Sequence, residues 1–127
     1  MTLHHILAQY KTLTADGFRD PASPDFSKWR RDLIDRTDYL EPARQWVSQF
    51  GKAKTHRASA YAIKHVMERD TGVYVTEGAF IVSALMEGFT MDEKRRGFLN
   101  IDRRDLDRYL KRREPLERKK PGNVNYC

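Results

Sequence analysis

The chain lacks the features that mark secreted, membrane-spanning and disulfide-bonded proteins. Its single cysteine, Cys127, is the last residue, so no disulfide can form within the chain. No apolar run approaches the ~20 residues that a helix needs to span a bilayer. The first residues also lack the basic start and the small-residue cleavage site of a signal peptide. These absences predict a cytoplasmic protein without a membrane partner.

Residue groupings that support catalysis or hold cofactors are equally scarce. The four histidines form no His-x-x-x-His pair, and two ligands do not make a zinc site, which needs three or four. The close carboxylate pairs, Asp32/Asp35 and Asp102/Asp105, lie in basic segments where helix caps and ion pairs account for them. No glycine loop that could cradle a phosphate is present. We therefore expect a non-enzymatic protein without metal, cofactor or small-molecule substrate.

Charge is abundant and unevenly distributed. Hydrophobic residues make up 39% of the chain and charged residues 33%, which is typical of a folded domain with a charged surface. The net charge is +6, and residues 92–127 hold nearly all of the excess, with twelve Lys and Arg against seven Asp and Glu. A basic end on a neutral body favours an anionic partner, either nucleic acid or an acidic protein face. A solvated surface accounts for such a charge run equally well.

The most apolar stretch, residues 59–89, predicts the centre of the core. We expect one helix between Ser59 and Gly72 and a second between Glu77 and Glu87. The second helix is apolar on nearly every side, and the rest of the chain must fold around such a helix to cover it.

Other elements are predicted from shorter patterns. Apolar residues recur at helical spacing from Leu3 to Leu13. Trp29 and Trp46 mark two further helices that we expect to pack together. Beyond the central stretch, short apolar runs flank the charged turn 92–97, a pattern that predicts a β-hairpin.

The expected fold is a single, mainly α domain over residues 1–113. It has about five helices, with the small β-hairpin just before the C-terminal helix. Residues 114–127 contain two prolines, one glycine and little apolar content, which predicts a basic C-terminal arm.

Polar and aromatic side chains off the core form the first candidate site. Tyr61, Lys64 and His65 lie on the polar side of their helix, where core packing does not require them. We expect Tyr74 and Phe80 at the edge of the same surface. Such groups mark a contact site more often than they arise by accident, although half-buried packing accounts for the two tyrosines equally well. These five residues are the predicted protein-binding surface.

The second candidate site is basic. Helix, turn, helix and hairpin follow one another as in a winged helix, with Lys94, Arg95 and Arg96 as a wing tip that contacts phosphate. The helix that would read bases, 77–87, has no Arg, Lys, Asn or Gln, so base-specific readout is not expected. Basic residues on the last helix extend a phosphate-binding track: Arg104, Arg108, Lys111 and Arg112.

Residues 59–89 also carry a sequence pattern that resembles one found in other proteins. Its residues are Ser59, Tyr61, Ile63, Lys64, His65, Glu68, Gly72, Tyr74, Val75, Thr76, Gly78, Ala79, Phe80, Ile81, Gly88 and Phe89. At these positions it resembles small, mostly uncharacterised accessory proteins of bacterial plasmids and integrative elements, whose core reads S-x-Y-G-L-K-H, a Glu, then G-x-Y-V-S-N-G-A-F-I and G-F. Phe98–Ile101 resembles a later F-N-I element of the group. Ala62 replaces the group's Gly, and Glu77 replaces its Asn.

This resemblance covers roughly a third of the chain and implies a mobile-element setting. Small proteins in that setting often regulate the element or disarm host defence, and CRISPR inhibitors are among them. The expected function is anti-CRISPR-like: inhibition or modulation of host nucleic-acid machinery by contact with a host protein or nucleoprotein complex. The alternative is a DNA- or RNA-binding accessory protein that uses its basic C-terminal third.

Overall fold

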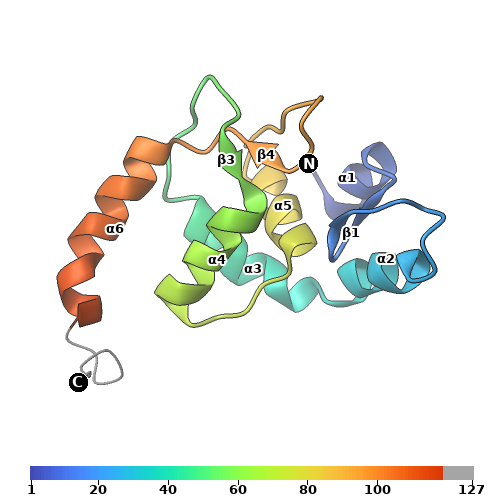
Figure 1. Cartoon of the computed structure of the whole chain (residues 1–127), viewed down its shortest axis with the longest axis horizontal. Helices are drawn as coiled ribbons and strands as arrows, with labels where there is room; N and C mark the ends of the chain where they lie inside the picture. The colour runs from blue at the N-terminus through green and yellow to red at the C-terminus, as the bar shows by residue number, and fades with distance from the viewer. Residues whose placement is uncertain (119–127) are drawn as a thin grey trace.

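The computed structural model describes residues 1–118, with side chains described through residue 112. This part of the chain is mainly α, as expected, but has six α-helices where about five were predicted (Figure 1). The helices are α1 (Leu3–Gln9), α2 (Phe26–Asp35), α3 (Leu40–Val47), α4 (Ala60–Thr71), α5 (Glu77–Met86) and α6 (Arg103–Arg118), and a 3-10 helix, η1 (Thr37–Tyr39), precedes α3. The strands are β1 (Leu13–Thr14), β2 (Gly17–Phe18), β3 (Ala58–Ser59) and β4 (Phe98–Leu99), and they form two separate antiparallel pairs.

Helix α5 lies at the centre of the molecule (Figure 1). Every residue from Gly78 to Leu85 is buried. Thr76 begins the helix as its N-cap, because its hydroxyl accepts the N–H of Ala79 at 3.1 Å. α1, α3, α4 and β2 all pack against α5. Enclosure on all sides is what so apolar a helix requires, and the predicted core is confirmed.

A close backbone approach fixes the β1–β2 hairpin on the first turn of α5. A Cβ atom at position 78 would collide with the carbonyl oxygen of Thr14. The N–H of Gly78 instead donates to the carbonyl of Ala15 at 3.0 Å. Glycine is therefore the residue that lets the hairpin sit there. This hairpin was not predicted: the apolar spacing suggested helix through Leu13, whereas α1 ends at Gln9.

The hairpin predicted around the turn 92–97 is present only in part. Met91 forms a single bridge to Leu99. The main partner of β4 is β3, with Ala58 opposite Leu99 and Ser59 opposite Phe98. Strands of two residues carry too little alternation to reveal their partners, and this pairing joins segments far apart in the chain.

The two tryptophans belong to different parts of the molecule. Trp46 on α3 packs against Phe50, Phe80 and Tyr109, and its indole N–H donates to Asp70 at 2.9 Å. Trp29 lies on α2, which packs chiefly against β1. We expected the two tryptophan-bearing helices to pack together, but α3 packs chiefly against α5 and α2 packs chiefly against β1.

Helix α6 extends into the expected basic arm. α6 continues past the expected boundary at residue 113 and reaches Arg118, while residues 119–127 lie outside the described residues. Among the helices of residues 1–118, none combines the length and the apolar character needed to cross a membrane.

Candidate functional site

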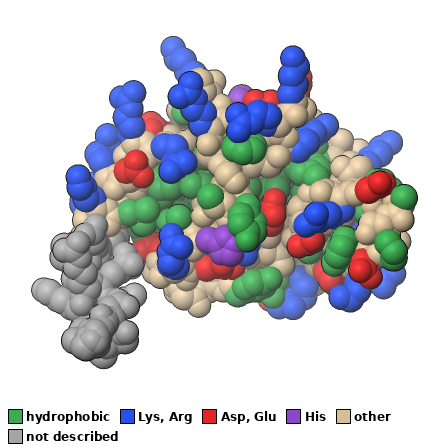
Figure 2. Space-filling model, in the orientation of Figure 1, with side chains coloured by type: hydrophobic (Ala, Val, Ile, Leu, Met, Phe, Trp, Pro, Cys, Tyr) green, Lys and Arg blue, Asp and Glu red, His purple; other side chains and the backbone are tan. Residues whose placement is uncertain are grey.

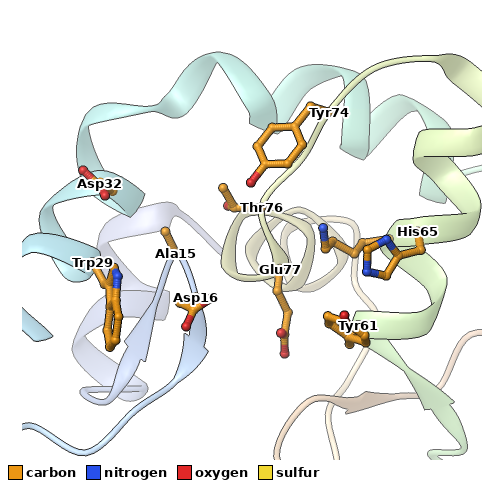
Figure 3. A pocket seen from close by; sticks show the side chains of 10 residues that line it. Ala15, Asp16, Trp29, Asp32, Tyr61, His65, Tyr74, Thr76 and Glu77 are labelled. Carbon is orange, nitrogen blue, oxygen red and sulfur yellow. The ribbon is translucent and has the colours of Figure 1, made fainter. Parts of the chain in front are cut away.

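Four of the five residues predicted to bind a protein partner meet at one surface hollow. The hollow has a volume of about 310 Å³ and lies between α2, the β1–β2 turn, α4 and the start of α5. We call it the aromatic hollow, and its lining residues are Ala15, Asp16, Trp29, Asp32, Tyr61, Lys64, His65, Tyr74, Thr76 and Glu77. Figure 3 shows Trp29 and Asp16 on one side, Tyr61 and His65 on the other, and Glu77 between them. Helical spacing on α4 brings Tyr61, Lys64 and His65 together, and the loop after α4 adds Tyr74.

The two basic residues of the hollow share one carboxylate. The Lys64 Nζ atom lies 3.2 Å from Glu68 Oε2, and the His65 Nδ1 atom lies 3.2 Å from Glu68 Oε1. Glu68 also accepts the N–H of Val75 at 3.1 Å. Burial opposes ionisation of Glu68, but the Val75 N–H and the Lys64 cation outweigh it and lower the carboxyl pKa below its ordinary value.

Lys64 is therefore a largely buried side chain, although its place on the polar side of the helix suggested that packing does not require it. Only 9% of its side chain is exposed. Its Nζ atom also lies 5.3 Å from the centre of the Tyr74 ring, within the range of a cation–π contact. A lysine on the polar side of a helix can fold its long stem against the surface, and helical periodicity does not reveal this.

The two tyrosines are the exposed members of the hollow. Tyr61 and Tyr74 are each 58% exposed. The Tyr61 ring meets the His65 imidazole edge-on at 4.5 Å, and the Tyr74 ring meets Tyr39 in the same way at 5.6 Å. Neighbouring rings thus hold both side chains in place while much of each stays open to solvent.

Phe80, the fifth predicted residue, belongs to the core. Its side chain is fully buried, and its ring centre lies 6.3 Å from that of Trp46. It was expected at the surface because it falls on the thin polar line of α5. Two polar residues of that line contact α3: Ser83 donates to the Leu40 carbonyl at 3.3 Å, and Glu87 pairs with Arg44 at 2.6 Å.

The acidic lining of the hollow was not predicted. Burial raises the pKa of the Glu77 carboxyl, and the negative charge of Asp16 adds to this effect. Asp16 pairs with Arg19 at 2.7 Å, whereas the carboxylates of Asp32 and Glu77 have no ion-pair or hydrogen-bond partner within residues 1–112. The fold brings these groups together from three separate segments, so no local pattern could have indicated them.

The second candidate site comprises the basic turn 92–97 and the basic residues of α6. In the turn 92–97, Asp92 accepts the N–H groups of Lys94 and Arg95 at 2.8 and 3.0 Å. The Arg95 guanidinium lies 3.9 Å from the centre of the Phe98 ring, and that of Arg96 lies 5.0 Å from the centre of the Tyr10 ring. Figure 2 shows Lys and Arg side chains along the upper edge, over the α3–β3 and α5–β4 loops of Figure 1.

The predicted basic residues of α6 are exposed. Arg108 pairs with Asp105 at 3.0 Å. The other basic residues of α6 and those of the turn form no ion pair within residues 1–112. They are Arg104, Lys111 and Arg112 on α6, and Lys94, Arg95 and Arg96 in the turn. Helix α5 cannot act as the recognition helix of a winged helix, because it is enclosed in the core and cannot enter a groove of DNA.

Side chains that could hold a metal ion are not grouped in the part of the chain that the structure describes: no three His, Cys, Asp or Glu residues come together suitably. Comparisons of the chain with family models, with curated proteins and with solved structures give no match.

Proposed function

We propose that the chain is a non-enzymatic binding protein of a mobile genetic element. It acts in the cytoplasm and inhibits or modulates host nucleic-acid machinery, in the manner of an anti-CRISPR protein, by contact with a host protein or nucleoprotein complex. The aromatic hollow is its contact site. The observation that carries the proposal is the convergence of Tyr61 and Tyr74, each more than half exposed, with His65 and Trp29 at one hollow.

The chemistry of the hollow favours recognition of a protein surface. Tyrosine and tryptophan are enriched among the residues that contribute most to protein–protein binding, because they offer a large contact area and a polar group. Lys64 and His65 both contact Glu68, which also holds the N–H of Val75. These two nitrogen-bearing side chains thus stabilise the wall of the hollow. The mobile-element setting rests on the sequence resemblance over residues 59–89.

Affinity capture with matched variants tests this proposal. The immobilised chain is exposed to lysate of a bacterial host, and captured proteins are quantified by mass spectrometry. Tyr61→Ala removes an exposed ring of the hollow, and Ile34→Ala is the control, because Ile34 is a 46% exposed apolar residue on α2 that does not line the hollow. We expect wild type and the control to capture the same component of the nucleic-acid machinery, and Tyr61→Ala to retain about a tenth as much. Equal capture by all three proteins would contradict the proposal.

A second candidate function is direct binding of DNA or RNA through the basic C-terminal third. The specific observation in its favour is that the basic side chains of the turn 92–97 and of α6, apart from Arg108, form no ion pair within residues 1–112. Unneutralised surface cations attract the phosphates of nucleic acid and release their counterions on binding.

A further inference from the structure

The segment between α3 and β3 contributes a basic hollow that connects the two predicted basic sites. Residues 52–57, which we call the connector, pack against the start of α6 around a hollow of about 480 Å³. Five of its nine lining residues are cationic: Lys52, Lys54, Arg57, Arg103 and Arg104. Of these, only Arg104 belonged to the predicted track, because a short basic loop shows nothing of its neighbours until the chain is folded.

The hollow carries an excess of positive charge, since Asp102 is the one acidic residue among its nine lining residues. None of its five cations forms an ion pair within residues 1–112. Asp102 accepts the N–H groups of Arg104 and Asp105, at 2.9 and 3.4 Å. Asp105 accepts the N–H of Gly51 at 2.7 Å and pairs with Arg108, and these two contacts lower its carboxyl pKa. The Asp102 carboxylate thus accepts N–H groups in the first turn of α6, and that of Asp105 holds α6 to Gly51, just before the connector.

Backbone contacts preform the hollow. The N–H of Ala53 donates to the carbonyl of Asn100 at 2.7 Å, and the Asn100 side chain donates back to the Ala53 carbonyl at 3.2 Å. The same side chain accepts the N–H of Thr90 at 2.7 Å. Asn100 is 9% exposed, so these bonds are shielded from water. The backbone that carries these cations is therefore already in place before a ligand binds, which reduces the entropic cost of binding.

The other end of the connector leads toward the turn 92–97. His56 Nε2 lies 2.8 Å from the Thr90 hydroxyl, and the N–H of Ala60 donates to the carbonyl of Gly97 at 2.8 Å. The turn, the connector and the start of α6 thus follow one another along the upper edge in Figures 1 and 2. Segments far apart in the sequence form one basic edge.

We propose that the connector hollow binds phosphate groups of a nucleic-acid backbone, between contacts made by the turn 92–97 and by α6. This inference rests on the second candidate function, direct nucleic-acid binding, and specifies its central contact. The proposed contact is with the phosphate backbone, because lysine and arginine charges neutralise phosphates whatever the base sequence.

Nucleic acid fits this edge better than an acidic protein does. Protein interfaces have an apolar or aromatic centre inside a polar rim. The exposed large hydrophobic residues of the described chain lie elsewhere: Met1, Ile34, Tyr61, Val73 and Tyr74. The phenylalanine rings at the edge are covered by cations, with Lys52 over Phe89 at 4.7 Å and Arg95 over Phe98 at 3.9 Å.

Fluorescence anisotropy with charge-matched variants tests the inference. The probes are a labelled random-sequence 30-base single strand and the corresponding duplex, each titrated at three salt concentrations. Lys54→Glu combined with Arg57→Glu reverses two charges of the hollow. Lys28→Glu combined with Arg31→Glu is the control, because it makes the same charge change at two exposed residues of α2. Equal melting temperatures establish that both variants fold.

For each probe, we expect the dissociation constants of wild type and the α2 control to agree within about threefold. The connector variant should bind about tenfold more weakly or worse, and its slope of log affinity against log salt should flatten by roughly one to two units, as loss of two phosphate contacts requires. Equal weakening by both variants would overturn the connector hollow while leaving nucleic-acid binding in place. Failure of wild type to bind either probe at low salt would overturn both. Binding of poly-glutamate as tightly as the probes would overturn nucleic acid as the ligand.

Discussion

Replacing Lys64 by methionine should destabilise the protein, because Lys64 holds the wall of the aromatic hollow together. Its Nζ atom lies 3.2 Å from Glu68, and 9% of the Lys64 side chain and 19% of the Glu68 side chain are exposed. Losing one partner of a fully buried pair costs about 3–5 kcal/mol, whereas an exposed pair contributes under about 1 kcal/mol. This half-shielded pair lies between these limits, and we expect a loss of about 1–3 kcal/mol. Methionine retains most of the lysine stem, so packing changes little.

Urea denaturation followed by circular dichroism measures this loss. Wild type, Lys64→Met, Glu68→Gln and the double variant form a cycle that isolates the pair, and we expect a coupling free energy of about 1–2 kcal/mol at neutral pH. The folded-state pKa of Glu68 is lowered, so its contribution is present above the ordinary pKa of a glutamate and is lost as pH falls through the lowered value. The difference between wild type and Lys64→Met should accordingly shrink in acid.

An unchanged urea midpoint for Lys64→Met, together with a coupling free energy near zero, would refute this prediction. Lys64 would then be a solvated surface residue, as helical periodicity alone suggests. The contact between Glu68 and the Val75 N–H would also lose its role in fixing the loop that carries Tyr74.

Three further substitutions test the fold and the hollow. Phe80→Ala should destabilise by about 3–5 kcal/mol in urea denaturation, because it leaves a cavity against Trp46, and a wild-type midpoint would place Phe80 outside the core. Gly78→Ala should lower the melting temperature and shift the amide resonances of residues 13–18, since the added methyl group displaces the β1–β2 hairpin; unchanged spectra would disprove the close approach. Asp16→Asn should lower the pKa of Glu77 in an NMR titration, and an unaltered titration would show that the two carboxylates do not interact.

The central helices could be predicted because their signals are local. Both helices begin at a residue whose side chain caps them: the Ser59 hydroxyl accepts the N–H of Ala62, and the Thr76 hydroxyl accepts the N–H of Ala79. Gly72 ends α4 in the left-handed conformation, with a φ of 75°, as glycine at that position predicts. Composition around the whole perimeter of α5 indicated burial on all sides, which is independent of what packs against it.

The missed features all depend on neighbours from distant segments. β3 and β4 are each two residues long, so neither strand indicates its partner. Phe80 lies on a polar line that α3 happens to cover, and Lys64 reaches a glutamate one turn away instead of solvent. Periodicity assigns a residue to a face of its helix but does not say whether another element covers that face.

The same limit applied to the two candidate surfaces. Tyr61, His65 and Tyr74 were found because helical spacing and a nearby loop suffice to group them. The carboxylates opposite them come from α2 and the β1–β2 turn, and the connector cations meet α6 only in the folded chain. Sequence thus identified one side of each surface, and the fold supplied the other.

Hydrogen–deuterium exchange of the chain alone and in complex with the captured host partner tests the central claim most directly. A partner seated in the aromatic hollow should slow exchange in the loop 72–76 and in the β1–β2 turn, because these backbone segments border the hollow. The connector 52–57 and the turn 92–97 serve as the internal comparison. Slowed exchange confined to the connector and the turn 92–97, or no change anywhere in the chain, would contradict the claim that the hollow is the site of contact.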